Sequence, residues 1–137
     1  MSAIGLLGAA LLVGIGGGLG AVVRWGVSAL GLRLVAAQGR EHLDETVRPG
    51  TTMLANLLAC FLLGLVVARL GSAGGVREFV YLMLAAGFCG GLSTMSTAAA
   101  DVVELVRRRT FSLALANLLL SAGAGMAALW LGLVLAS

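Results

Sequence analysis

Four long stretches without a charged residue dominate this 137-residue sequence. They run over residues 1–23, 49–68, 79–100 and 110–137. A helix needs about 20 apolar residues to cross a hydrocarbon core of about 30 Å, and each stretch reaches that length. Because backbone polar groups in lipid must be satisfied internally, helices are the spanning form that such apolar stretches permit. The sequence therefore predicts an all-α membrane protein with four transmembrane helices.

We expect a single transmembrane domain over residues 1–137, with spans at about residues 4–32, 50–69, 79–106 and 110–135. The first span is not interpreted as a signal peptide, because no basic segment precedes it and no Ala-x-Ala site comes before Arg24. The charged segment 25–48 should extend the first helix before turning back. Pro49 should open the second helix, where its missing N–H costs nothing. A Gly/Ser turn at residues 71–78 should join the second and third spans.

Composition argues against two other classes of protein. Charged residues make up 11% of the chain and apolar residues 60%, whereas a soluble domain carries about 25% charged residues. The nine basic residues sit at segment ends rather than in a groove-sized patch, so nucleic acid is not an expected partner.

Cys60 and Cys89 lie inside apolar runs, and we interpret them as small buried hydrophobes rather than as a disulfide or metal ligands.

Glycines four residues apart recur in two of the spans. Gly16 and Gly20 share a face of the first span, and Gly87 and Gly91 share a face of the third. In lipid, close backbone approach through small residues does much of the work of helix association. We expect these faces to mark contacts between helices.

Three polar side chains lie within otherwise apolar spans. Asn56 is in the second span, and Asn117 and Ser121 share a face of the fourth. An amide in hydrocarbon costs several kcal/mol unless it finds a partner, so these groups should face protein or water. Two interpretations stay open: hydrogen bonds that only hold the helices together, or a polar path with a function.

The third span contains the most unusual segment, GFCGGLSTMST at residues 87–97. Two adjacent glycines, Gly90 and Gly91, precede four hydroxyl side chains within five residues, which makes a poor continuous helix. We expect the third helix to be broken near mid-membrane. Unwinding there exposes carbonyls that can coordinate a cation and N–H groups that can face an anion, which is tolerated only where backbone is buried in protein or lines a cavity.

Carboxylates occur within the spans only at the very end of the third, as Asp101 and Glu104. Helical spacing predicts that they pair with Arg108. Proton-coupled exporters generally need a carboxylate or His inside the membrane. A small multidrug exporter, the competing interpretation, would need a Glu in the first span, and residues 1–23 contain none. Amide, hydroxyl and backbone donors instead suit a small anion that must also leave again.

Taken in order, these features resemble the Fluc/CrcB family of fluoride channels over essentially the whole chain. The resemblance rests on the Gly-rich first helix ending in Arg24-Trp25, on the segment from Pro49 through Asn56, on the glycine–hydroxyl segment, and on Asn117 with Ser121. It implies a channel subunit of the cell membrane, not an enzyme. Such subunits pair antiparallel with a second subunit, identical or related, and export fluoride passively through pores at the interface.

The resemblance also implies roles for particular residues. A structural Na⁺ at the dimer centre would be held by the backbone carbonyls of Gly90 and Ser93, and Arg24 would lie by an aqueous vestibule. The anion pathway would be lined by Asn56, Thr94, Met95, Ser96, Asn117 and Ser121.

The sequence departs from the family pattern at two positions. Met95 and Ala98 stand where the family usually has phenylalanines, whose electropositive ring edges accompany the anion in such channels. Ala98 has no ring edge to offer, and Met95 is polarizable but offers none either. Ser93 replaces a Thr, a change that keeps the backbone carbonyl. These departures raise the alternative of a non-conducting subunit that completes a partner's pores.

Arginines are distributed unequally between the two ends of the expected bundle. With four spans, both termini and the turn at residues 71–78 share the end that carries Arg69 and Arg77. The other seven arginines fall at the opposite end. Arg-rich ends near short loops tend to stay cytoplasmic, so we expect both termini outside. An antiparallel homodimer needs one sequence that inserts both ways, so the bias favours a heterodimer with a partner of opposite bias.

Overall fold

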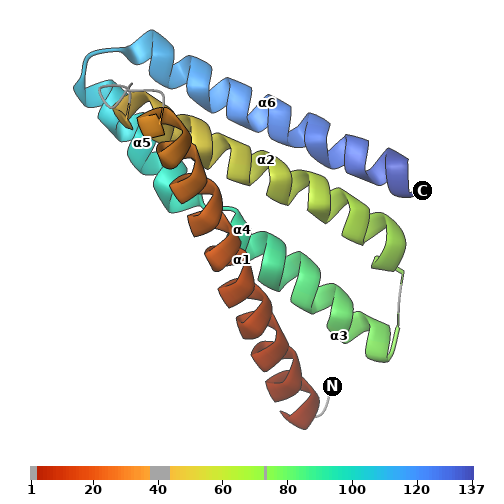
Figure 1. Ribbon diagram of the computed structural model, residues 1–137. Coiled ribbons are helices and arrows are strands. Elements are labelled where there is room, and N and C mark those ends of the chain that lie inside the picture. The colour runs from red at the N-terminus through yellow and green to blue at the C-terminus, as the bar shows by residue number, and fades with distance from the viewer. Residues whose placement is uncertain (1–2, 38–43, 73) are drawn as a thin grey trace.

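The computed structural model describes residues 3–37, 44–72 and 74–137, and nearly all of them are helical (Figure 1). Two long helices come first, α1 (Ala3–Ala37) and α2 (Asp44–Leu70), and α6 (Phe111–Ala136) comes last. The region between them is the third span, which is built from four consecutive pieces. These pieces are α3 (Val76–Leu82), the π-helix η2 (Met83–Cys89), α4 (Gly90–Leu92) and α5 (Met95–Arg107).

Four segments of the described chain are long and apolar enough to cross a membrane. Both the number of spans and the interruption of the third confirm the prediction from the sequence. Each segment begins and ends within a single helical turn of the expected range. The segments are Ala3–Leu34, Gly50–Leu70, Val76–Arg107 and Phe111–Ala136.

The expectation that Pro49 opens the second helix is wrong. The helix α2 already begins at Asp44, so Pro49 lies in its second turn. There the missing N–H removes one helical hydrogen bond, to the carbonyl of Glu45. The apolar part of α2 starts only at Gly50, so this gap lies where water can satisfy the carbonyl, outside the hydrocarbon.

The spans pack as two pairs of helices that run in parallel (Figure 1). One pair is α2 with α6, and the other is α1 crossing the third span at η2 and α4. The helices α2 and α6 end at the end of the bundle where α1 and the third span begin. Both chain ends and the turn after α2 therefore share one end of the bundle, as the alternation of spans predicts.

Glycine faces carry the contact between α1 and the third span. A Cβ added to Gly87 would lie 2.7 Å from the Val13 carbonyl oxygen and 3.1 Å from the Cα of Gly16. One turn on, a Cβ added to Gly20 would lie 2.7 Å from the backbone nitrogen of Leu92. A side chain at any of these glycines would force the two backbones apart. The predicted contacts through the glycine faces are therefore confirmed.

A second glycine contact joins α2 to α6. A Cβ on Gly64 would lie 2.9 Å from the backbone nitrogen of Leu133, and one on Gly132 would lie 3.1 Å from that of Leu65. At the end of this pair, the Arg69 Nε donates a 2.7 Å hydrogen bond to the Ala136 carbonyl oxygen. The contact continues toward the start of the two helices, where a Cβ on Gly125 would lie 3.4 Å from the Cys60 Sγ.

The interior where the two pairs meet is small. Ala55 and Ala59 of α2 and Leu92 at the end of α4 form a buried cluster, against which Val27 and Phe88 pack. Large apolar side chains are instead exposed along the outer faces of α1 and α6, as expected for helices that contact lipid. The buried cluster positions the end of α4 against the middle of α2.

Candidate functional site: the break in the third span

The third helix is interrupted at two hydroxyl residues. Ser93 (φ −78°, ψ 148°) and Thr94 (φ −145°, ψ 115°) are extended, whereas the residues on either side are helical. Gly90 and Gly91, whose low helix propensity suggested the break, remain in α4. The glycines therefore do not themselves unwind. Gly91 allows close packing on Gly17 of α1 instead.

An amide from another span holds the break open. The backbone N–H of Thr94 donates a 2.8 Å hydrogen bond to the side-chain Oδ1 of Asn56. In a continuous helix the same N–H would bond to the carbonyl of Gly90. Asn56 therefore replaces that carbonyl as the acceptor, which satisfies an N–H that could not otherwise be left unpaired in an apolar environment.

The Thr94 side chain caps the helix that follows. Its buried Oγ1 accepts from the backbone N–H of Thr97 at 3.4 Å and lies 3.1 Å from the Ser96 Oγ and 3.2 Å from the Thr97 Oγ1. Thr94 is thus the N-cap of α5, a position that favours a short hydroxyl side chain. Ser96 and Thr97 are exposed, so the three hydroxyls extend from the interior to the surface of the subunit.

Because these two N–H groups bond to side chains, the carbonyls of Gly90 and Ser93 lose their helical donors. The helical donor for the Gly90 carbonyl is the Thr94 N–H, which bonds to Asn56 instead. The helical donor for the Ser93 carbonyl is the Thr97 N–H, which bonds to the Thr94 hydroxyl. On the other side of the break, Met95 and Ser96 open α5, where N–H groups have no acceptor within the helix. The break therefore combines carbonyl oxygens that have lost their helical donors with N–H groups that have no helical acceptor.

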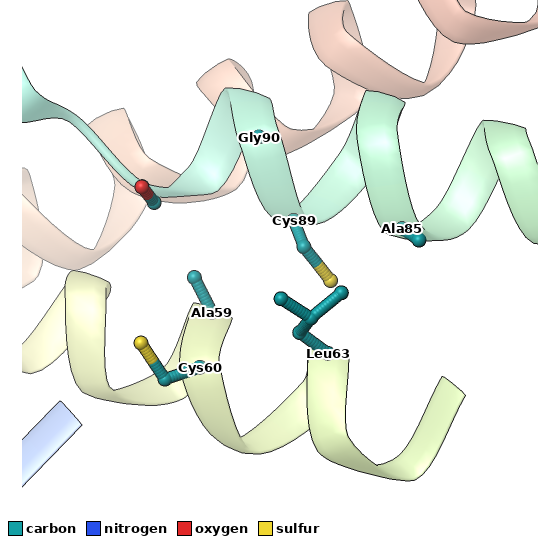
Figure 2. A pocket seen from close by; sticks show the side chains of 7 residues that line it. Ala59, Cys60, Leu63, Ala85, Cys89 and Gly90 are labelled. Carbon is teal, nitrogen blue, oxygen red and sulfur yellow. The ribbon is translucent and has the colours of Figure 1, made fainter. Parts of the chain in front are cut away.

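A cavity of about 150 Å³ lies beside the break, between α2 and the third span (Figure 2). Cys89 extends toward Leu63 across it, while the thiol of Cys60 points away from that of Cys89. Both cysteines are free, Cys89 buried and Cys60 half-buried. The cavity is lined by Ala59, Cys60, Leu63, Ala85, Cys89, Gly90 and Ser93.

The remaining expected pathway residues are less closely gathered. Met95 is 86% exposed at the start of α5. Asn117 and Ser121 are half-buried on α6, and Ser121 lies one turn before Gly125, whose added Cβ would contact the Cys60 Sγ. Neither Asn117 nor Ser121 bonds to Asn56 within the described residues. Arg24, expected by a vestibule, follows the Gly20 contact by one turn of α1, toward the C-terminal end of that helix.

Carboxylates take little part in this site. Within the part of the chain that the structure describes, no three His, Cys, Asp or Glu side chains are placed to share a metal ion. Glu104 pairs with Arg108 at 2.9 Å, as its spacing predicts, and both groups are exposed. A cation at the break would thus be held by main-chain and hydroxyl oxygens.

Two features of the site are not predicted from the sequence. The first is the partner of Asn56: a hydrogen bond between helices is one of the two roles expected for this side chain, but the Thr94 N–H lies 38 residues away and no local pattern connects them. The second is the contact of Gly64 with Gly132. A signal for it exists, since Gly64 with Ala68 and Gly132 with Ala136 have the same spacing of small residues that marks the other glycine faces.

Four apolar spans, with the third broken at hydroxyls, define a small multi-pass integral membrane protein that has a polar site inside the bilayer. Residues 11–133 match the family model described as CrcB-like protein, Camphor Resistance (CrcB). The chain therefore belongs to the CrcB family, as its sequence features predict.

Named relatives match most of the chain. A fluoride-specific ion channel FluC from Pseudomonas putida (strain W619) is 37% identical over 84% of this chain and 83% of its own length. FluC 2 from Rhodococcus jostii (strain RHA1) is 36% identical over 93% of this chain and 97% of its own. FluC from Serratia proteamaculans (strain 568) is 38% identical over 85% and 84%.

Proposed function

We propose that this chain is a subunit of a fluoride channel that carries fluoride passively across the cell membrane. The relatives named above are fluoride-specific ion channels and match the chain over nearly its whole length. The observation that carries the proposal is the break at Ser93 and Thr94, which presents neutral N–H and hydroxyl donors inside an apolar span. Such donors can replace part of an anion's hydration without holding it too tightly to leave.

In this proposal Asn56 has two roles that use different atoms. Its Oδ1 accepts from the Thr94 N–H, so its Nδ2 can donate to a passing anion. The exposed Ser96 hydroxyl and the half-buried Ser121 of α6 extend a track of donors. We place Thr94, Met95 and Asn117 along the same pathway and Arg24 at its aqueous mouth, where a positive charge concentrates anions.

A structural Na⁺ at the break fits the chemistry of its oxygens. The Gly90 and Ser93 carbonyls have lost their helical donors to Asn56 and Thr94. Main-chain carbonyls suit a hard monovalent cation, whereas a divalent ion would call for carboxylates. Gly90 is exposed at the subunit surface, where a second subunit could add its own pair of carbonyls around a shared ion.

The second subunit is proposed to lie antiparallel to the first and to be a different chain. The arginine-poor end of this chain carries Arg69 and Arg77, and the opposite end carries the other seven arginines. Such a bias favours one orientation in the membrane. A partner with the opposite bias would insert the other way and complete the antiparallel pair.

The small multidrug exporter is not favoured, because α1 carries no carboxylate within the membrane and the relatives are named as channels. Fluoride efflux from liposomes that contain this chain alone, or this chain with a related partner, tests the proposed function. Chloride-loaded liposomes are the control for leak. Fluoride efflux in either preparation, without chloride efflux, supports the proposed function. Fluoride efflux that requires the partner would mean that this chain conducts only as part of a heterodimer. Absence of fluoride efflux in both would contradict it.

A further inference from the structure

The turn that joins the third span to α6 is closed by a defined set of backbone hydrogen bonds. The Thr110 N–H donates to the Leu105 carbonyl at 3.1 Å, and the Arg109 N–H donates to the Val106 carbonyl at 2.9 Å. This is the pattern of a Schellman motif, in which the residue after the helix cap adopts a left-handed conformation. The Thr110 Oγ1 adds a 2.7 Å bond to the Leu105 carbonyl. The backbone of the turn therefore has a defined conformation, which fixes the positions from which its side chains extend.

Arg109 occupies the left-handed position of this motif, with φ 59°. Glycine is the usual residue there, because an L side chain costs about 1–2 kcal/mol in that conformation. Within the described residues, Arg109 is the only non-glycine residue at positive φ. A strained residue of this kind points to a use for its side chain.

The arginines of the turn have unequal surroundings. Arg108 is engaged by Glu104 at 2.9 Å. Arg107 and Arg109 are exposed, and neither forms a salt bridge with a carboxylate in the described part of the chain. Two guanidinium groups two residues apart thus remain available to a negatively charged partner.

Apolar side chains on both sides of the turn indicate where it lies relative to the bilayer. Val106, just before it, is 38% exposed, and Phe111, just after it, is 64% exposed. Val103, one turn before Val106, and Leu115, one turn after Phe111, are also exposed. Apolar side chains that face outward belong beside acyl chains, so the arginines between them lie at headgroup level.

We propose that Arg107 and Arg109 bind the phosphate of an anionic phospholipid, with its acyl chains lying against Val106 and Phe111. A guanidinium pairs with phosphate through two parallel hydrogen bonds. Basic groups next to a span attract anionic headgroups. The arginine-rich end is also the one expected to face the cytoplasm, whose leaflet holds such lipids.

A free inorganic phosphate shares the charge of the headgroup but has no acyl chains. It would use the arginines without the contacts at Val106 and Phe111. We therefore expect the arginines and the apolar side chains beside them to bind the anionic lipid more tightly than phosphate in solution. The same groups should bind zwitterionic lipid more weakly, because its headgroup carries a compensating positive charge.

Native mass spectrometry of the purified full chain in detergent, titrated with phosphatidylglycerol or phosphatidylcholine, tests the proposal. We expect selective retention of phosphatidylglycerol, and about a 25-fold weaker affinity for it in an Arg107→Gln/Arg109→Gly variant, from about fivefold per arginine. Glycine suits the left-handed position, so this variant keeps its turn. Arg77→Gln, an exposed arginine of α3 at the opposite end, is the matched control and should bind like the wild type.

Three outcomes would overturn the proposal. One is equal phosphatidylglycerol affinity in the double variant and the wild type. Another is a loss of about fivefold in Arg77→Gln, the loss per arginine that is expected only at the turn, which would mean that net charge alone is responsible. The third is full displacement by excess inorganic phosphate. A single symmetrical elution peak checks that the variants are folded, and the fluoride efflux assay is separate, so the lipid proposal can fail without the proposed function.

Discussion

The Oδ1 of Asn56 accepts the backbone N–H of Thr94 at 2.8 Å, and this bond joins the middle of α2 to the break in the third span. It gives one N–H a choice between two acceptors, the Asn56 amide and the Gly90 carbonyl. A bond to Asn56 leaves the Gly90 carbonyl without its helical donor and the helix broken. A bond to the Gly90 carbonyl would make the helix continuous. The polar chemistry of the break therefore depends on a side chain of another helix.

Replacing Asn56 with Asp separates its two proposed roles. The carboxylate still accepts from the Thr94 N–H, so we expect the protein to assemble as the wild type does. It no longer offers an N–H to an anion and adds a negative charge, so fluoride flux should be abolished. Liposome efflux measures the flux. Asn56→Leu, which also removes the acceptor, should in addition lower the stability by about 1–3 kcal/mol. Unchanged flux in Asn56→Asp would show that the residue only holds the helices together.

The proposed Na⁺ site uses the Ser93 carbonyl rather than its hydroxyl. Ser93→Ala should therefore keep the Na⁺-dependent rise in melting temperature, which follows from binding to the folded state. Thr94→Val is the informative contrast. Without the Thr94 hydroxyl, the Thr97 N–H loses its acceptor and the start of α5, beside the Ser93 carbonyl, is less firmly held, so the Na⁺ dependence should weaken and the lost cap should cost about 1 kcal/mol. Loss of Na⁺ dependence in Ser93→Ala would count against the carbonyl assignment.

Two glycines of α6 should respond differently to the same substitution. A Cβ on Gly132 would meet the backbone of α2 at Leu65, so Gly132→Ala should destabilise the protein by about 1–3 kcal/mol. Gly123 has nothing within 4 Å of its added Cβ, and Gly123→Ala should be neutral or slightly stabilising. Thermal unfolding in detergent compares the two. Equal melting temperatures would mean that the α2–α6 contact contributes little.

The arginine bias predicts that both termini lie outside the cell. A Cys placed at Ser137 should react with a membrane-impermeant maleimide in intact cells that express this chain without a partner. A Cys placed at Ser112, near the opposite end of α6, should react only after the membrane is opened. Cys60 and Cys89 lie within spans and are replaced by Ala in both variants. Equal labelling of Ser137→Cys from both sides would remove the charge argument and favour an antiparallel homodimer.

Most of the fold follows from local sequence patterns, whereas the site follows from them only in part. Charge-free stretches define the spans because length and apolarity are what a bilayer requires. The glycine spacing of Gly16 with Gly20 predicts a contact because it acts through one helix face. The position of the break at Ser93 and Thr94 needs the Asn56 amide, which a one-dimensional pattern does not reveal. A glycine pair indicates where a helix is weak, and the position of the break depends on where another acceptor is found.

The Asn56–Thr94 bond also bears on the order in which the protein assembles. An isolated third span has no Asn56, and in lipid its Thr94 N–H would have no acceptor other than the Gly90 carbonyl. The break would then close, so it should form only once α2 has docked. A peptide of residues 76–107 in bilayers should accordingly protect the Thr94 amide from hydrogen exchange as a continuous helix does, and rapid exchange there would show that the break is local. On this account, the binding groups of the subunit are created by helix association within the membrane.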